Sequence, residues 1–104
     1  MFKVAALYKF SQIDNPLEVQ IYLKKILKNL SIYGTILVGN EGINGTIASR
    51  DIKNLNKALM YLKNLKGFKD LDIKFSNSKK KPFIRLKIKL KQEYDFHLLI
   101  ANNK

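Results

Sequence analysis

The chain has 104 residues, 46% of them apolar, with no cysteine and a formal net charge of +12. This size and apolar content indicate one globular domain rather than a disordered chain, and no apolar run approaches the ~20 residues that a membrane span needs. Because cysteine is absent, disulfides, thiolate metal sites and cysteine nucleophiles are excluded within the chain.

The first predicted element is a strand over residues 3–10, where apolar and polar residues alternate loosely. Lys9 interrupts the apolar run and no small-residue cleavage site follows it, so the run does not have the form of a signal peptide. Together with the absence of cysteine, this pattern leads us to expect a cytoplasmic protein.

A helix is predicted to begin at Pro16, whose missing N–H does no harm at the first helical position. Asn15 precedes it as the N-cap, and Glu18 completes a capping box. The helix should end near Ser31, before Gly34. Its predicted apolar face consists of Val19, Leu23, Ile26, Leu27 and Leu30.

A hairpin rich in glycine and asparagine is predicted next, with strands over residues 35–39 and 43–48. Glycine and asparagine tolerate positive φ, so the favoured interpretation is a tight turn whose glycines meet backbone demands. The alternative is a contact loop that presents backbone N–H groups and polar side chains to a ligand. The polar residues of this contact loop are Asn40, Glu41 and Asn44.

The second half of the chain is predicted to hold one helix and two strands. Residues 49–51 can cap the helix, and Gly67 suits its stop. Residues 71–76 alternate in character, and residues 83–91 form the clearest strand in the sequence. The predicted core face of the helix consists of Ile52, Leu55, Leu59 and Leu62.

The resulting order, β-α-β-β-α-β-β, predicts an α+β fold of the ferredoxin-like or acylphosphatase-like type. Two helices should cover one face of a mostly antiparallel sheet, and the other face is left to solvent or to a partner. We expect one domain over residues 1–93 and an atypical tail over residues 94–104.

Residues 73–92 contain eight basic residues and no acidic one. Alternation places four of them on one face of the last strand, and Lys74 is predicted to join them from a neighbouring strand. Small α+β domains hold RNA on such cationic sheet faces, but lysines also simply keep a sheet soluble, and 18 Lys against 2 Arg fits a compositional bias. The predicted nucleic-acid-binding residues are Lys74, Lys79, Lys80, Lys81, Arg85, Lys87, Lys89 and Lys91.

The signatures of an enzyme are missing from the sequence. The only histidine, His97, has no partner for a catalytic triad or a metal site, and no glycine-rich phosphate loop is present. We therefore predict no catalytic residue, no metal and no cofactor. Acylphosphatases share the predicted element order, but residues 9–15 lack the arginine expected in their phosphate-binding loop.

Three segments resemble the N-terminal domain of the rhodanese-related tRNA uridine hydroxylases: residues 6–10 (ALYKF), 41–45 (EGING) and 82–89 (PFIRLKIK). The resemblance covers about residues 5–93. In that family this domain precedes a rhodanese domain with the reactive cysteine, and the full enzymes hydroxylate the wobble uridine of tRNA at C5 with oxygen. The chain stops where the rhodanese domain should begin, so the resemblance transfers no catalytic residue.

The leading hypothesis is therefore a binding module without the catalytic half, which helps to bind tRNA or to dock a rhodanese domain. Its own enzymatic activity is left open, and we expect none from the module alone. The alternatives are a small acylphosphatase-like hydrolase and a remnant of a split gene without function.

Overall fold

The computed structural model describes residues 1–81 and 85–91, and its elements follow the predicted order. The predicted boundary near residue 93 and the tail lie outside the described residues and stay predictions. No helix in the described part is long and apolar enough to cross a bilayer. In chain order the elements are β1 (Phe2–Phe10), α1 (Pro16–Leu27), β2 (Tyr33–Gly39), β3 (Gly42–Ser49), α2 (Ile52–Lys63), β4 (Asp72–Ser78) and β5 (Leu86–Leu90).

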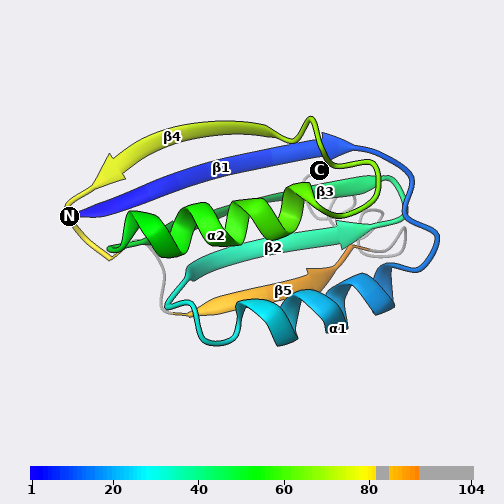
Figure 1. Ribbon diagram of the computed structural model, residues 1–104, viewed down its shortest axis with the longest axis horizontal. Helices are drawn as coiled ribbons and strands as arrows, with labels where there is room; N and C mark the ends of the chain where they lie inside the picture. The colour runs from blue at the N-terminus through cyan, green and yellow to red at the C-terminus, as the bar shows by residue number, and fades with distance from the viewer. Residues whose placement is uncertain (82–84, 92–104) are drawn as a thin grey trace, which may run out of the picture.

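The five strands form one sheet in the order β4-β1-β3-β2-β5, and both helices lie on the same side of it (Figure 1). The pairs β1–β3, β1–β4 and β2–β3 are antiparallel, whereas β2 and β5 are parallel. β4 and β5 are consecutive in the chain, yet they form the two opposite edges of the sheet. This arrangement confirms the predicted ferredoxin-like, acylphosphatase-like fold.

The predicted start of α1 is confirmed. The side chain of Asn15 accepts a hydrogen bond from the backbone N–H of Glu18 at 3.2 Å, so it satisfies one of the N–H groups that a helix leaves unpaired. The helix ends at Leu27 rather than near residue 31. Ser31 adopts a positive φ of 52°, a conformation incompatible with a continuing helix, and this turns the chain into β2.

The cap of α2 is also confirmed, since Asp51 accepts a hydrogen bond from the N–H of Lys53 at 2.9 Å. The prediction that Ile52 belongs to the core is wrong: this residue is 43% exposed. It is the first residue after the cap, and the helix turns it away from the sheet. Ala58 is buried instead, together with Leu55, Leu59 and Leu62.

The sheet has two unlike sides, which we call the helix face and the open face. On the helix face the register aligns large aliphatic side chains such as Leu7, Ile36, Ile47 and Ile88, and these pack with both helices into the core. α1 lies over β5 and β2, and α2 lies over β3 and β1 (Figure 1). The alternate residues of each strand point to the open face.

Candidate nucleic-acid interface

The turn between β2 and β3 is a structural hairpin that is tied to the loop after β1. The N–H of Ser11 donates to the carbonyl of Glu41 at 3.0 Å, and the N–H of Ile13 donates to the carbonyl of Asn40 at 2.9 Å. The side-chain amide of Asn40 in turn donates to the carbonyl of Ile13 at 3.0 Å. Asn40, predicted as a contact residue, therefore uses its amide to hold two loops together.

The glycine content of this hairpin has a steric cause at Gly42. Its φ is +149°, and a Cβ atom there would run into the backbone carbonyl of Lys9 on the neighbouring strand. Neither Asn40 nor Glu41 has a positive φ. Only Gly42 in this turn therefore has a backbone conformation that requires glycine. The backbone conformations at Asn40 and Glu41 are open to other residue types.

The eight predicted cations do not form one patch. Lys87 and Lys89 share the open face of β5, with the exposed Arg85 just before the strand. Lys91 pairs with Glu41, with 2.9 Å between the ammonium and the carboxylate. Three exposed lysines lie in the segment that leaves β4, and one of them places its ammonium 4.3 Å from the ring centroid of Tyr33. These three are Lys79, Lys80 and Lys81.

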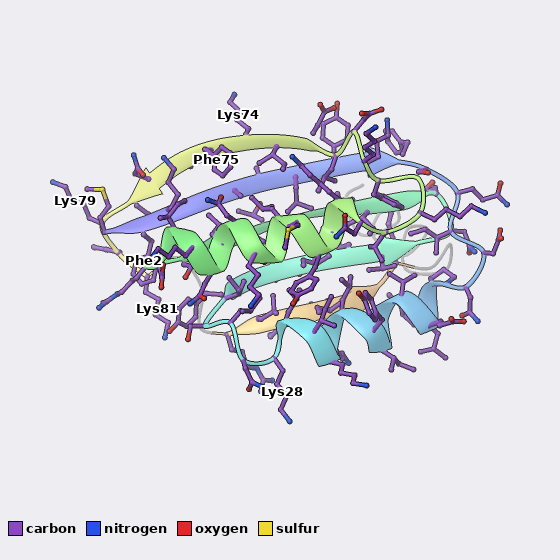
Figure 2. The ribbon with its side chains drawn as sticks, viewed as in Figure 1. Phe2, Lys28, Lys74, Phe75, Lys79 and Lys81 are labelled. Carbon is purple, nitrogen blue, oxygen red and sulfur yellow. The ribbon has the colours of Figure 1, made fainter. Side chains whose placement is uncertain are left out.

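The prediction that Lys74 joins the β5 lysines from a neighbouring strand is wrong. β4 and β5 are separated by β1, β3 and β2, so Lys74 stands on the opposite edge of the sheet. Figure 2 shows it projecting beyond β4, far from Lys28 on the α1 side. Alternation assigned the correct face to Lys74, because it faces the same side as Lys87, but alternation carries no information on strand order.

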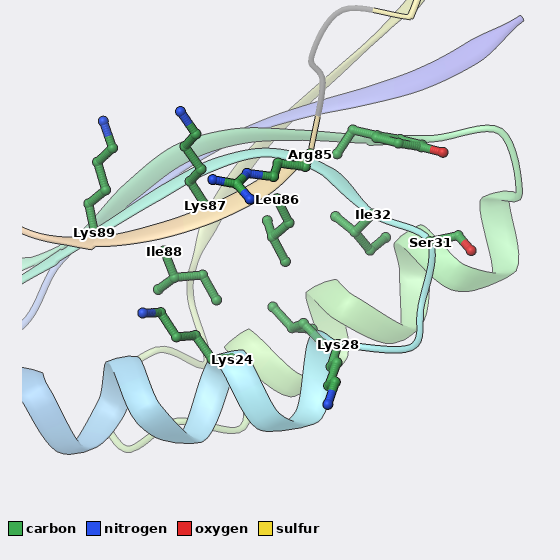
Figure 3. Close-up of a pocket in the computed structure, with 11 residues that line it drawn as sticks. Lys24, Lys28, Ser31, Ile32, Arg85, Leu86, Lys87, Ile88 and Lys89 are labelled. Carbon is green, nitrogen blue, oxygen red and sulfur yellow. The ribbon is translucent and has the colours of Figure 1, made fainter.

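The structure adds two cations that sequence reasoning missed. Lys24 and Lys28, at the C-terminal end of α1, line a pocket of about 590 Å³ together with three of the predicted residues. Figure 3 shows Lys87 and Lys89 pointing to one side of β5, while Lys24 and Lys28 lie at the end of α1 on the other side, with the Lys28 side chain turned away from the strand. We call this group the β5-edge cluster: Lys24, Lys28, Arg85, Lys87 and Lys89.

No carboxylate lines this pocket among the described residues, and all five cations of the β5-edge cluster are exposed. Its floor is apolar, with Leu86 and Ile88 facing α1 (Figure 3). A basic turn at a helix C-terminus also complements the helix dipole, and that was the available sequence signal for Lys24. Exposed cations around a shallow hollow can contact phosphates without losing their hydration entirely.

The loop after β1 lacks the features of a phosphate-binding loop, and this argues against the acylphosphatase alternative. A phosphate cradle needs backbone N–H groups that point at the anion, but those of Ser11 and Ile13 donate to the β2–β3 turn. The neighbouring pocket of about 460 Å³ is lined by Asp14 and Glu18, which repel phosphate, against a single lysine. In the described residues no cluster of three or more metal-ligating side chains exists.

The sheet order, the parallel last strand and the two helices on one face define an acylphosphatase-like α+β domain. Acylphosphatase from Bacillus subtilis superposes with a TM-score of 0.61 at 13% identity, covering 88% of this chain and all of that one. BlrB, a BLUF protein in its dark state, superposes with a TM-score of 0.70 at 9% identity, covering 97% of this chain and 79% of that one. At these identities the likeness concerns the fold alone.

The family model described as the UPF0176 acylphosphatase-like domain matches residues 2–94, and the chain belongs to this family. Relatives with the name tRNA uridine(34) hydroxylase are 41% identical over 90 residues in Acinetobacter baumannii (strain AYE) and 38% identical over 92 residues in Caulobacter vibrioides (strain NA1000 / CB15N). These matches cover 86% and 88% of this chain but 28% and 29% of the relatives. The chain corresponds to their N-terminal module, as the sequence resemblance implied.

Proposed function

We propose that this domain is the tRNA-holding module of a tRNA uridine hydroxylase and that it contacts the tRNA backbone through the β5-edge cluster. The observation that carries the proposal is the grouping of five exposed cations on the two sides of β5, next to a hollow that no carboxylate lines among the described residues. A polyanion gains electrostatic attraction from such a group and releases condensed counterions on binding. The names of the relatives supply the tRNA as the natural polyanion.

We place the chemistry of hydroxylation in other parts of the longer relatives, because the resemblance implies a reactive cysteine in a rhodanese domain and the present chain spans less than a third of those proteins. A rhodanese domain is the second partner that we propose, as the sequence resemblance implies. The module would hold tRNA while that partner domain presents its reactive group. Since tRNA is the proposed ligand, we place the protein in the cytoplasm.

The test removes two charges from the β5-edge cluster in the 104-residue chain. We expect the double variant Lys87→Gln/Lys89→Gln to bind unmodified tRNA more weakly. The association constant should also depend less on salt: the negative slope of log K against log salt should become shallower by about one per lysine. Gel-shift or anisotropy titrations at several salt concentrations measure both quantities. The matched control is Lys53→Gln/Lys57→Gln, which removes the same charge from exposed positions on α2.

The control variant should keep the slope of the original protein to within a few tenths. If both double variants lower affinity equally, binding follows net charge and not this cluster. If the unaltered chain binds no tRNA at low salt, the proposal is wrong.

A further inference from the structure

The open face of the sheet carries an aromatic residue on β1, Tyr8, that the fold does not use. Tyr8 is 51% exposed and Phe10 is 76% exposed, and their rings form an edge-to-face pair with centroids 6.1 Å apart. Both project from β1 to the side without helices. Two large exposed rings next to each other contribute little to burial, so packing does not explain their presence.

The aromatic pair at the other end of the same face is different. Phe2 is only 2% exposed and meets Tyr33 edge to face at 5.9 Å. Arg50 lies 5.1 Å from the ring of Phe2, and Lys81 lies 4.3 Å from the ring of Tyr33. Phe2 and Tyr33 thus contact each other and neighbouring cations at that end of the sheet, so packing explains their presence. Tyr8 and Phe10 differ because they are exposed.

Tyr8 stands between two hollows on the open face. One hollow, of about 630 Å³, has a floor of small residues such as Ala6 and Thr46; the other, of about 300 Å³, lies between Tyr8, Phe10 and Lys91. Tyr8 and Asn44 line both hollows and are opposite each other in the register of β1 and β3. The Tyr8 side chain therefore borders open space both toward Ala6 and toward Phe10, and the Asn44 amide, which can donate and accept, lines the same two hollows.

The charged residues of the open face are distributed unevenly around Tyr8. The register places one row of residues across all five strands: Asp72, Tyr8, Asn44, Leu37 and Lys89. The row ends in the carboxylate of Asp72 on the β4 side, with Lys74 two residues along on the same face, and in a cation of the β5-edge cluster on the other side. A strand of nucleic acid is favoured with its phosphates toward Lys89 and its bases toward Tyr8.

We propose that the open face binds single-stranded RNA, with unpaired bases stacked against Tyr8 and a base edge hydrogen-bonded to Asn44. This inference rests on the proposed tRNA-holding function and adds to it a site for unpaired bases. Stacking on an aromatic ring needs an accessible base face, which a duplex does not offer. A protein partner is disfavoured because the centre of the face consists of small and polar side chains, such as Thr35 and Thr46, which offer little apolar area.

The chain has no tryptophan, so Tyr8→Trp introduces a single fluorescent reporter at the proposed site. We expect oligo(U) of about ten residues to quench its emission in a saturable manner, because stacked bases quench indole fluorescence. The matched control is Tyr22→Trp, on the exposed outer side of α1. That variant should bind the oligonucleotide with the same affinity, measured by anisotropy of labelled RNA, and show no saturable quenching.

The affinity test uses two further variants. We expect Tyr8→Ala to weaken oligo(U) binding about tenfold and to leave binding of an RNA duplex of equal length unchanged. Tyr8→Phe keeps the ring and should remain within about twofold of the original. Circular dichroism verifies that Tyr8→Ala is folded, and the agreement of Tyr8→Phe with the original protein separates loss of the ring from loss of the fold.

The outcomes separate this inference from the proposed function. If oligo(U) and tRNA bind but Tyr8→Trp shows no quenching and Tyr8→Ala binds normally, the Tyr8 site is wrong and the β5-edge cluster stands. If neither RNA binds the unaltered chain, both proposals fall. If the emission of Tyr8→Trp shifts to shorter wavelength with protein concentration and without RNA, a second copy covers the open face and the RNA site is overturned.

Discussion

The two faces of the β-sheet differ in the side chains that they carry and in how deeply these are buried. On the helix face, Ile36 and Ile47 of neighbouring strands are fully buried, and Leu23 and Leu62 of the two helices are buried as completely. On the open face, the same strands carry Thr35, Thr46 and other small or polar side chains. The helix face is thus set by the need to fill a core, whereas the open face has no such need. Residues of the open face are consequently available for a ligand, and Tyr8 is the clearest example.

The largest effect should come from a comparison of adjacent residues on β2. We expect Ile36→Ala to lower the free energy of unfolding by about 2–4 kcal/mol, because it leaves a cavity in the core. Thr35→Ala, one residue away on the open face, should change it by no more than about 0.5 kcal/mol. Urea denaturation measures both values. Similar losses from the two variants would mean that the open face is packed as well.

Gly42 tests the junction between the two hairpin strands. We expect Gly42→Ala to destabilise the domain by about 1–3 kcal/mol, because the residue has a positive φ and its new methyl group meets the Lys9 carbonyl. Thr46→Ala on the same strand is the control and should be nearly neutral. A neutral result for Gly42→Ala in the same denaturation experiment would show that the backbone of the turn relaxes without cost.

The cap of α1 should have an intermediate effect. We expect Asn15→Ala to cost about 1 kcal/mol, since the N–H of Glu18 loses the side-chain acceptor that now satisfies it. Asn15→Asp retains an acceptor in the same place and should be nearly as stable as the original. The thermal midpoints of the two variants, measured side by side, provide the check. Equal midpoints for the alanine and aspartate variants would contradict the capping role.

The ion pair at the rim of the open face should have the smallest effect. Its side chains are 29% exposed at Lys91 and 60% exposed at Glu41, so solvent screens the attraction. We expect Glu41→Gln to cost about 0–1 kcal/mol, and less at 1 M salt than at 0.1 M salt. A larger loss, or one that salt does not reduce, would show that Glu41 holds the turn by more than its charge.

Local patterns were sufficient to predict the type and order of the elements, and the reasons are visible at particular residues. Asn15, Pro16 and Asp51 act within one helical turn, and the alternation from residue 86 to 90 fixes which side chains face α1. These signals depend only on neighbours in the sequence. For this reason the class of fold followed from the sequence as well, once the order of elements was known.

The composition of the candidate site could not be predicted in the same way. The error over Lys74 arose because the two edges of the sheet are consecutive in the chain, and periodicity does not define strand order. Lys24 and Lys28 join the β5-edge cluster only because α1 lies over β5, some 60 residues later in the sequence. The pairing of Glu41 with Lys91 spans 50 residues and depends on the same long-range arrangement.

The parallel pairing of β5 with β2 also has a consequence for the order in which the chain folds. The first four strands can pair with one another once residue 78 has left the ribosome, but the β5 edge of the sheet stays incomplete until β5 has left it as well. Until then, α1 lacks one of its two strand contacts, and the edge of β2 is open to pairing with other chains. Once β5 is in place, the side chain of Gln20 on α1 donates to the carbonyl of Ile88 at 2.7 Å and fastens the last strand. The strand that carries Lys87 and Lys89 is therefore also the strand that covers the open edge of β2 and prevents its pairing with other chains.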